Sequence, residues 1–173
     1  MIAIRILLTT VSCMLCGLLF LHFIWWDLSF FMIPVLMSIS ISLTNFDLIS
    51  LRKKFFAIHL HLSLSLIVFF VSVGCTFALS SRTAHHEAFY IGSALGAILF
   101  ALITNIILPF RQIWITFLVT IFLSLLVFPI AAYFQRESDI PILNKKEAIV
   151  TIWMTLVGLG TSIGIHWRKE KLT

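Results

Sequence analysis

The sequence predicts an all-α, polytopic membrane protein, a single bundle of six transmembrane helices that takes up residues 1–173 as one domain. Three observations lead to this class. The chain is 61% hydrophobic and 11% charged, with a mean hydropathy of +1.11, whereas about 25% of the residues in a soluble domain are charged. Its apolar residues form continuous runs of the roughly 20 residues that a helix needs to cross a hydrocarbon core. Nearly all charges lie at or between the ends of these runs.

The runs are continuous and do not alternate in short strands, so helices are favoured over a β-barrel. The first is expected to be a retained helix, because no small-residue cleavage site follows MIAIR. The second starts after Trp25-Trp26-Asp27, where two Trp residues suit a membrane interface. The third follows the basic residues Arg52 to Lys54, and the last three are separated by short polar segments. The predicted spans are 6–26, 28–50, 55–79, 88–108, 112–134 and 147–167.

The distribution of Lys and Arg predicts the orientation of the bundle. Six spans place both termini on one side, and that side carries eight of the twelve Lys and Arg residues, against four on the other. Because these residues are enriched in cytoplasmic loops, we expect both termini in the cytoplasm, and a bacterial cytoplasmic membrane as the setting. The cations form no stripe with interleaved aromatic residues, so the sequence argues against a nucleic-acid partner.

The three helices that are expected to run inward end alike. They read LTNFDLISLR, ITNIILPFR and GTSIGIHWR, each with a Thr seven or eight residues before an Arg. One interpretation is a bundle of three repeated helical hairpins. The other is that these residue types are common at inner membrane borders and recur by chance.

Four glycines are predicted to mediate helix packing. Gly92 with Gly96, and Gly160 with Gly164, are spaced four residues apart, so each pair shares a helix face and lets another backbone approach closely. Packing within one bundle is the first interpretation. Association of two copies through one of these faces is the second.

Polar residues inside the spans follow helical spacing and are candidates for a solute path. Ser, Thr, Asn and His at membrane depth usually face the bundle interior. The alternative is that the hydroxyls simply bond to the carbonyl one turn back; the amide of Asn45 is not expected to be satisfied so locally. The path candidates are Ser38, Ser42, Asn45, His61, Ser65, Thr104, Asn105, Thr155 and Ser162.

Metal and redox sites have weaker support. Histidines and carboxylates near the outer border are compatible with a divalent cation, but their spacing fits no zinc motif. A haem between His61 and His166 is a further alternative, and Cys13 with Cys16 has the spacing of a redox pair, although buried small residues explain it better. No cofactor is expected. The weak metal candidates are His22, Asp27, His85, His86 and Glu87.

Two classes of function therefore compete. The polar faces, the prolines inside spans and the repeat favour a small transporter, a channel or a membrane subunit of a transport complex, of unknown substrate. The lack of carboxylates near the membrane midplane favours a non-catalytic interaction, assembly or immunity-type protein. An enzyme is left open and a non-enzymatic role is expected. The lipid bilayer is the expected partner, with a second copy or another protein as further candidates.

Overall fold

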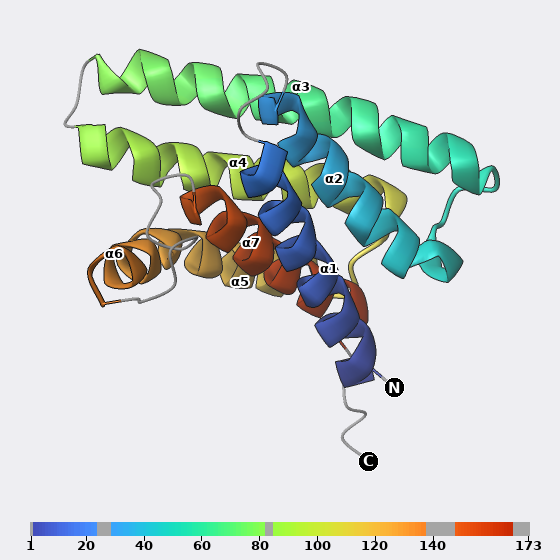
Figure 1. The fold of residues 1–173 in the computed structure, drawn as a ribbon. Coiled ribbons are helices and arrows are strands. Elements are labelled where there is room, and N and C mark those ends of the chain that lie inside the picture. Colours follow the sequence, from blue (N-terminus) through green and yellow to red (C-terminus); the bar gives the residue numbers. More distant parts are fainter. Residues whose placement is uncertain (1, 24–28, 82–84, 138–147, 168–173) are drawn as a thin grey trace.

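The structure of the protein is a computed structural model that describes residues 2–23, 29–81, 85–137 and 148–167 (Figure 1). This part of the chain is helical and contains no strand, so the predicted all-α class is confirmed. Five of its helical segments are long and apolar enough to cross a membrane, which fits an integral membrane protein. The helices are α1 (Ile2–Phe23), α2 (Ser29–Thr44), the 3-10 helix η1 (Phe46–Leu48), α3 (Lys54–Ser80), α4 (His85–Ile107), α5 (Ile113–Leu125), α6 (Val127–Glu137) and α7 (Ala148–His166).

The C-terminal helix α7 occupies the centre of the bundle. It packs mainly against α1 and α5, and it also touches α2, α4 and α6. Helices α3 and α4 form an antiparallel hairpin along one side, and α2 lies between α1 and α3 (Figure 1). Each pair of neighbouring helices in the three predicted hairpins is in contact, but the repeat itself stays a prediction.

Among these helices, the more buried ones tend to be less apolar. Of the five long apolar segments, α7 is the most buried inside the bundle and the least apolar, whereas α3 is the least buried and is more apolar than α7. A helix that faces lipid must be apolar, because lipid offers no partner to a polar side chain. A helix enclosed by protein can carry Gly, Ser and Thr instead, as α7 does.

The predicted second span is wrong at its inner end. We expected a helix to residue 50, but α2 ends at Thr44 and η1 follows directly. Asn45 lies outside helical geometry, with φ −123° and ψ 27°, and its side-chain Nδ2 donates to the carbonyl of Ile41 at 2.9 Å. An Asn side chain that bonds to backbone groups competes with the helix in this way.

The predicted fifth span is not one continuous helix. The segment Ile113–Phe134 is apolar throughout, but α5 ends at Leu125 and α6 starts at Val127. Pro129 has no N–H to donate to the carbonyl of Leu125, four residues earlier, which explains a break at this point. In Figure 1, α6 is seen end-on beside α5, which lies across the view.

Close helix contacts centre on the glycines of α7. A Cβ at Gly160 would lie 2.9 Å from the backbone Cα of Thr120, and one at Gly164 would collide with the side chain of Thr116 on α5. On the opposite side, Gly158 lies against Cys13 of α1. These faces are therefore occupied by other helices of the same chain.

The other two predicted glycines, Gly92 and Gly96, belong to α4 and face α3, and Gly96 also faces α7. Gly92 is pressed against the Thr76 side chain. A Cβ at Gly96 would lie 3.4 Å from Ser72 Oγ and 3.5 Å from Trp153, which is ordinary contact. Gly96 therefore faces protein, but less tightly than Gly164 does.

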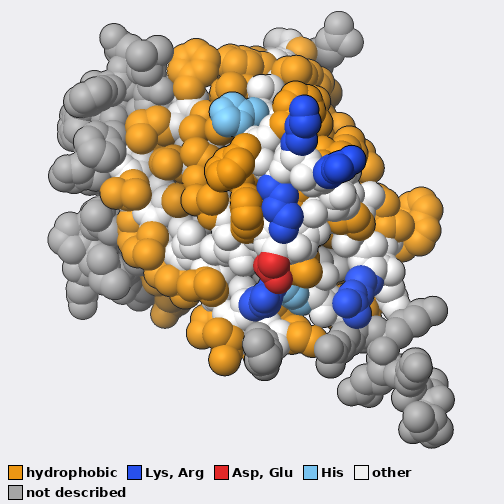
Figure 2. All heavy atoms as spheres, turned by 90° about the vertical axis from the view of Figure 1, so that its right-hand side faces the viewer, with side chains coloured by type: hydrophobic (Ala, Val, Ile, Leu, Met, Phe, Trp, Pro, Cys, Tyr) orange, Lys and Arg blue, Asp and Glu red, His pale blue; other side chains and the backbone are white. Residues whose placement is uncertain are grey.

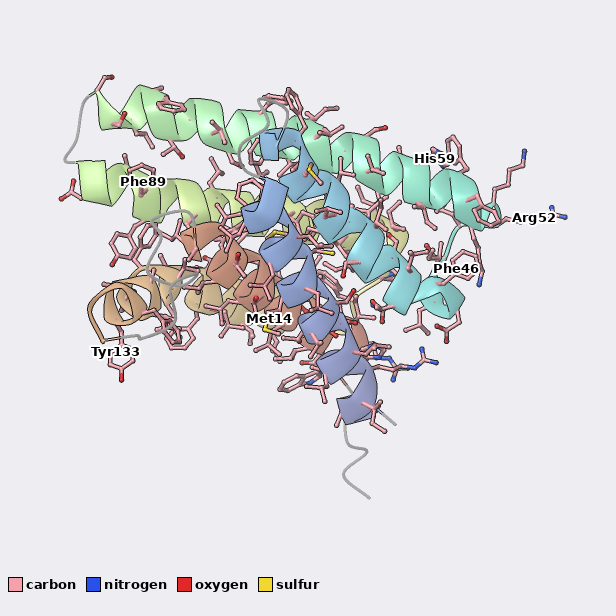
Figure 3. All side chains as sticks on the ribbon, in the orientation of Figure 1. Met14, Phe46, Arg52, His59, Phe89 and Tyr133 are labelled. Atoms are coloured by element: carbon pink, nitrogen blue, oxygen red, sulfur yellow. The ribbon has the colours of Figure 1, made fainter. Side chains whose placement is uncertain are left out.

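One end of the molecule is basic. Figure 2 looks onto this end and shows Lys and Arg side chains gathered around an acidic one. In Figure 3, Phe46 and Arg52 lie at this end, whereas Phe89 and Tyr133 lie at the other. The Lys and Arg residues with described side chains are Arg5, Arg52, Lys53, Lys54 and Arg111.

Candidate functional site

Asn45 joins three helices next to the basic end. Its Nδ2 donates to Thr9 Oγ1 of α1 at 3.2 Å, to Thr44 Oγ1 at 3.1 Å and to the Ile41 carbonyl. Its Oδ1 accepts from His166 Nε2 of α7 at 2.8 Å. Asn45 is fully buried, and both ends of its amide are used. The expectation that this amide lacks a local partner was wrong, because the Ile41 carbonyl supplies one.

His61 forms a second network one turn deeper. Its Nδ1 lies 2.8 Å from Ser42 Oγ of α2, and its Nε2 lies 3.1 Å from Thr104 Oγ1 of α4. The Thr104 hydroxyl donates its hydrogen to the Phe100 carbonyl, so its oxygen must accept from the Nε2–H of His61. A neutral imidazole then accepts at Nδ1 from Ser42, which satisfies every partner.

A third polar contact lies further along α2. Ser38 Oγ donates to the Pro34 carbonyl at 2.7 Å and is hydrogen-bonded to Ser65 Oγ of α3 at 2.5 Å, and both serines are buried. Ser38 and Ser42 lie on the same side of α2 because they are four residues apart, and Asn45 follows three residues later, directly after the helix ends. At 1.5 Å per residue, the three contacts extend over about 10 Å of the helix.

The other path candidates are placed apart from these networks. Asn105 Oδ1 accepts from the Phe110 N–H at 2.8 Å and so closes the end of α4. Thr155 donates to the carbonyl of Thr151 one turn back. Ser162 is fully buried on α7, and its Oγ has no hydrogen-bond partner in the part of the chain that is described. The structure thus brings together Ser38, Ser42, Asn45, His61, Ser65 and Thr104, and not Asn105 or Thr155.

A cavity of about 500 Å³ opens at the basic end, beside the Asn45 network. It lies where α1, η1, the α4–α5 connection and the end of α7 meet. His166 contributes to its wall and is hydrogen-bonded to Asn45 behind it. Its polar lining residues are Arg5, Asp47, Arg111 and His166, and its apolar ones are Ile2, Leu48, Leu108, Pro109 and Ile165.

Two of the residues that line this cavity, Arg5 and Asp47, form an ion pair. Arg5 Nη1 donates to both carboxylate oxygens of Asp47, at 2.9 and 2.7 Å. These hydrogen bonds from Arg5 hold the pKa of the Asp47 carboxyl below its usual range, so the pair is present above the ordinary carboxyl pKa and is lost as the pH falls through the lowered value. Lys54 fixes the same turn by donating to the Phe46 carbonyl at 3.0 Å.

The metal and redox candidates gain no support from the geometry. Asp27 and the side chains of His22, His85 and His86 lie outside the described residues, and Glu87 is exposed. Among the described side chains, no three His, Cys, Asp or Glu residues gather as metal ligands. The Nε2 atoms of His61 and His166 are hydrogen-bonded to protein oxygens, so neither of these two nitrogens is free for a haem iron. Cys13 is a free, buried thiol packed against Gly158.

Of the polar residues that line the cavity, only His166 was a candidate in the sequence. Arg5 was interpreted only as a topology signal, Arg111 as a topology signal and as part of the possible repeat, and Asp47 and Thr9 were given no role. Arg5 and Thr9 are four residues apart and share a face of α1, which is a signal that sequence reading can use. The pairing of Arg5 with Asp47 spans 42 residues and has no local signature.

Comparison with protein-family models, curated proteins and solved structures finds no match to this chain.

Proposed function

We propose that this protein is a small membrane transporter whose solute path begins at the cavity beside His166. The observation that carries the proposal is the sequence of buried polar contacts leading inward from the cavity wall. His166 binds Asn45, His61 bridges Ser42 and Thr104 next to it, and Ser38 binds Ser65 beyond. Polar side chains at membrane depth are costly, and they commonly mark substrate or ion pathways.

Ser162 supports the same proposal from α7. It lies one turn from His166 and therefore on a similar side of the helix. Its hydroxyl is buried and has no hydrogen-bond partner among the described residues. A buried polar group without a partner costs free energy, and a passing solute or its water shell would supply one.

We further propose that the basic end is cytoplasmic. Five Lys and Arg side chains gather there (Figure 2), and cytoplasmic borders are enriched in these residues. The first residue of α1 and the last residue of α7 both line the cavity at this end. The path would accordingly open to the cytoplasm, with both termini on the same side.

A second candidate is a non-catalytic membrane protein that acts through a protein partner or a second copy. It is favoured by the dense interior, because the buried polar groups on α2 and α3 are already bonded to protein and the glycines of α7 are in close contact with their neighbours. Such a bundle needs no path. Transporter and interaction protein therefore differ in whether water reaches Ser42.

Cysteine accessibility tests this difference. In a variant without native cysteines, Ser42→Cys is treated with a water-soluble, membrane-impermeant thiol reagent from the basic side. A transporter should give a reactive Ser42→Cys, because its path opens during the cycle. The matched control is Ile41→Cys, which is equally buried in the hydrophobic core and should stay unreactive. Equal lack of reaction at both positions would reject the transport proposal and leave the interaction protein.

A further inference from the structure

We infer that the cavity at the basic end binds a single anionic group, a carboxylate or a phosphate. This inference rests on the proposed function, since it names the class of solute that the same cavity would admit. Small-molecule sites typically have volumes of 300–1,000 Å³, and this cavity has about 500 Å³. Among the described residues, two guanidinium groups and one carboxylate line it, so one positive charge of this set is left uncompensated.

Arg111 supplies that charge. Its side chain is exposed and lines the cavity, and no hydrogen bond or ion pair joins it to another of the described residues. A guanidinium offers five N–H donors in a planar fork that matches a carboxylate or a phosphate.

Arg5 is a second source of donors, although one of its nitrogens is already bonded to Asp47. Both of its bonds to Asp47 come from Nη1, so Asp47 fixes the direction of the side chain and leaves donors on Nε and Nη2. Lys54, by contrast, is held against the Phe46 carbonyl and ring and does not line the cavity. In the part of the chain that is described, the cations that line the cavity are therefore Arg111 and Arg5.

The apolar walls favour a ligand with a small charged end and an apolar remainder. Leu48, Leu108, Pro109 and Ile165 line the cavity around the guanidinium groups. Apolar walls lower the local dielectric constant and so strengthen a charge pair relative to water. A lipid with an anionic headgroup and a soluble organic acid both have this chemistry, and they differ in where they come from.

The test uses the full-length protein in nanodiscs of zwitterionic phosphatidylcholine. Inorganic phosphate and benzoate are titrated by calorimetry at pH 7.5, and the titration is repeated in nanodiscs that contain phosphatidylglycerol. We expect at least one of the two anions to bind in phosphatidylcholine. Weaker binding in the presence of phosphatidylglycerol would identify a lipid headgroup as a competing natural ligand, whereas unchanged binding would identify a soluble anion.

Arg111→Gln should weaken binding by about tenfold or more, because a hydrogen bond to a charged group is lost. Arg111→Lys keeps the positive charge but loses the planar fork of donors. Its affinity for the anion should lie between those of the unchanged protein and Arg111→Gln. Arg52→Gln removes an exposed cation at the same end, outside the cavity (Figure 3), and should bind as the unchanged protein does. Thermal unfolding without ligand checks that all three variants are folded.

Absence of binding, or an equal loss in Arg111→Gln and Arg52→Gln, would overturn the inference. Its failure is distinguishable from failure of the transport proposal, which is judged on the reactivity of Ser42→Cys. Anion binding with an unreactive Ser42→Cys would leave a ligand site on a bundle that does not transport. A reactive Ser42→Cys without anion binding would leave a path for a neutral or cationic solute.

Discussion

Asn45 combines two tasks that usually fall to separate residues. Its Nδ2 ends α2 by bonding to the Ile41 carbonyl, and its Oδ1 binds α7 through His166. In a membrane neither bond has a competitor from lipid, because the hydrocarbon region offers no polar partner. The same side chain therefore sets the length of α2 and joins that helix to the centre of the bundle.

The first prediction concerns the bond between Asn45 and His166. Asn45→Leu and His166→Leu should each destabilise the bundle, and a double-mutant cycle between them should give a coupling free energy of about 0.6–2 kcal/mol, the range of interhelical hydrogen bonds in membranes. Unfolding in a mixed detergent series measures it. The cycle of Asn105→Leu with His166→Leu is the control and should give no coupling, since Asn105 binds the Phe110 N–H instead. Equal coupling in both cycles would contradict the structure.

At the residue scale, sequence and structure agree on features that depend only on the spacing of residues along one helix. Ser38, Ser42 and Asn45 have the spacing of one helix face, and all three are buried. The partners of these residues come from other helices, at separations such as the 121 residues between Asn45 and His166. No periodicity encodes such a contact. Whether these residues line a path stays a prediction.

At the element scale, α7 owes its central place to its small residues. Gly158 admits Cys13 of α1, and Gly160 and Gly164 admit α5. Helices in lipid associate through such close packing, because the hydrophobic effect does not drive them together. The two glycines of the G-x-x-x-G spacing in α7, Gly160 and Gly164, both lie against α5. Gly17 of α1, which lies against Thr151 of α7, has no glycine at that spacing and was missed.

The second prediction, at the element scale, compares two glycines. Gly160→Ala should destabilise the bundle by about 1–3 kcal/mol, the usual cost of overpacking, because its Cβ would meet the Thr120 backbone at 2.9 Å. Gly74→Ala is the matched control, since no atom lies within 4 Å of its Cβ, and a helical Ala gains about 0.5–1 kcal/mol over Gly. Thermal unfolding in detergent measures both changes. An equal effect of the two substitutions would show that Gly160 is not at a helix contact.

The helix boundaries that the sequence placed wrongly have local causes. Apolarity continues past Thr44 and past Leu125, so hydropathy predicts longer spans than the helices that form. Asn45 and Pro129 end these helices through their own backbone and side-chain chemistry. Asn45 and the prolines inside the spans were noted in the sequence. Whether such a residue ends a helix depends on whether neighbouring groups bond to the backbone N–H and C=O groups that lose their helical partners.

At the scale of the molecule, charge and apolarity define a membrane-spanning body with one basic end. The least buried helix is more apolar than the central one, as expected where lipid is the outer solvent. The fold class follows from composition and run length alone. The cavity does not, because its lining residues come from four separate segments of the chain.

The central claim is that the basic end, with its cavity, faces the cytoplasm of a membrane-spanning bundle. Single cysteines at Lys53 and at Glu87, in a variant without native cysteines, test it with a membrane-impermeant maleimide applied to intact cells. Lys53 lies at the basic end and Glu87 in the first turn of α4, and both side chains are exposed. Glu87→Cys should be labelled directly, and Lys53→Cys only after the membrane is permeabilised. Labelling of Lys53→Cys in intact cells would contradict this orientation.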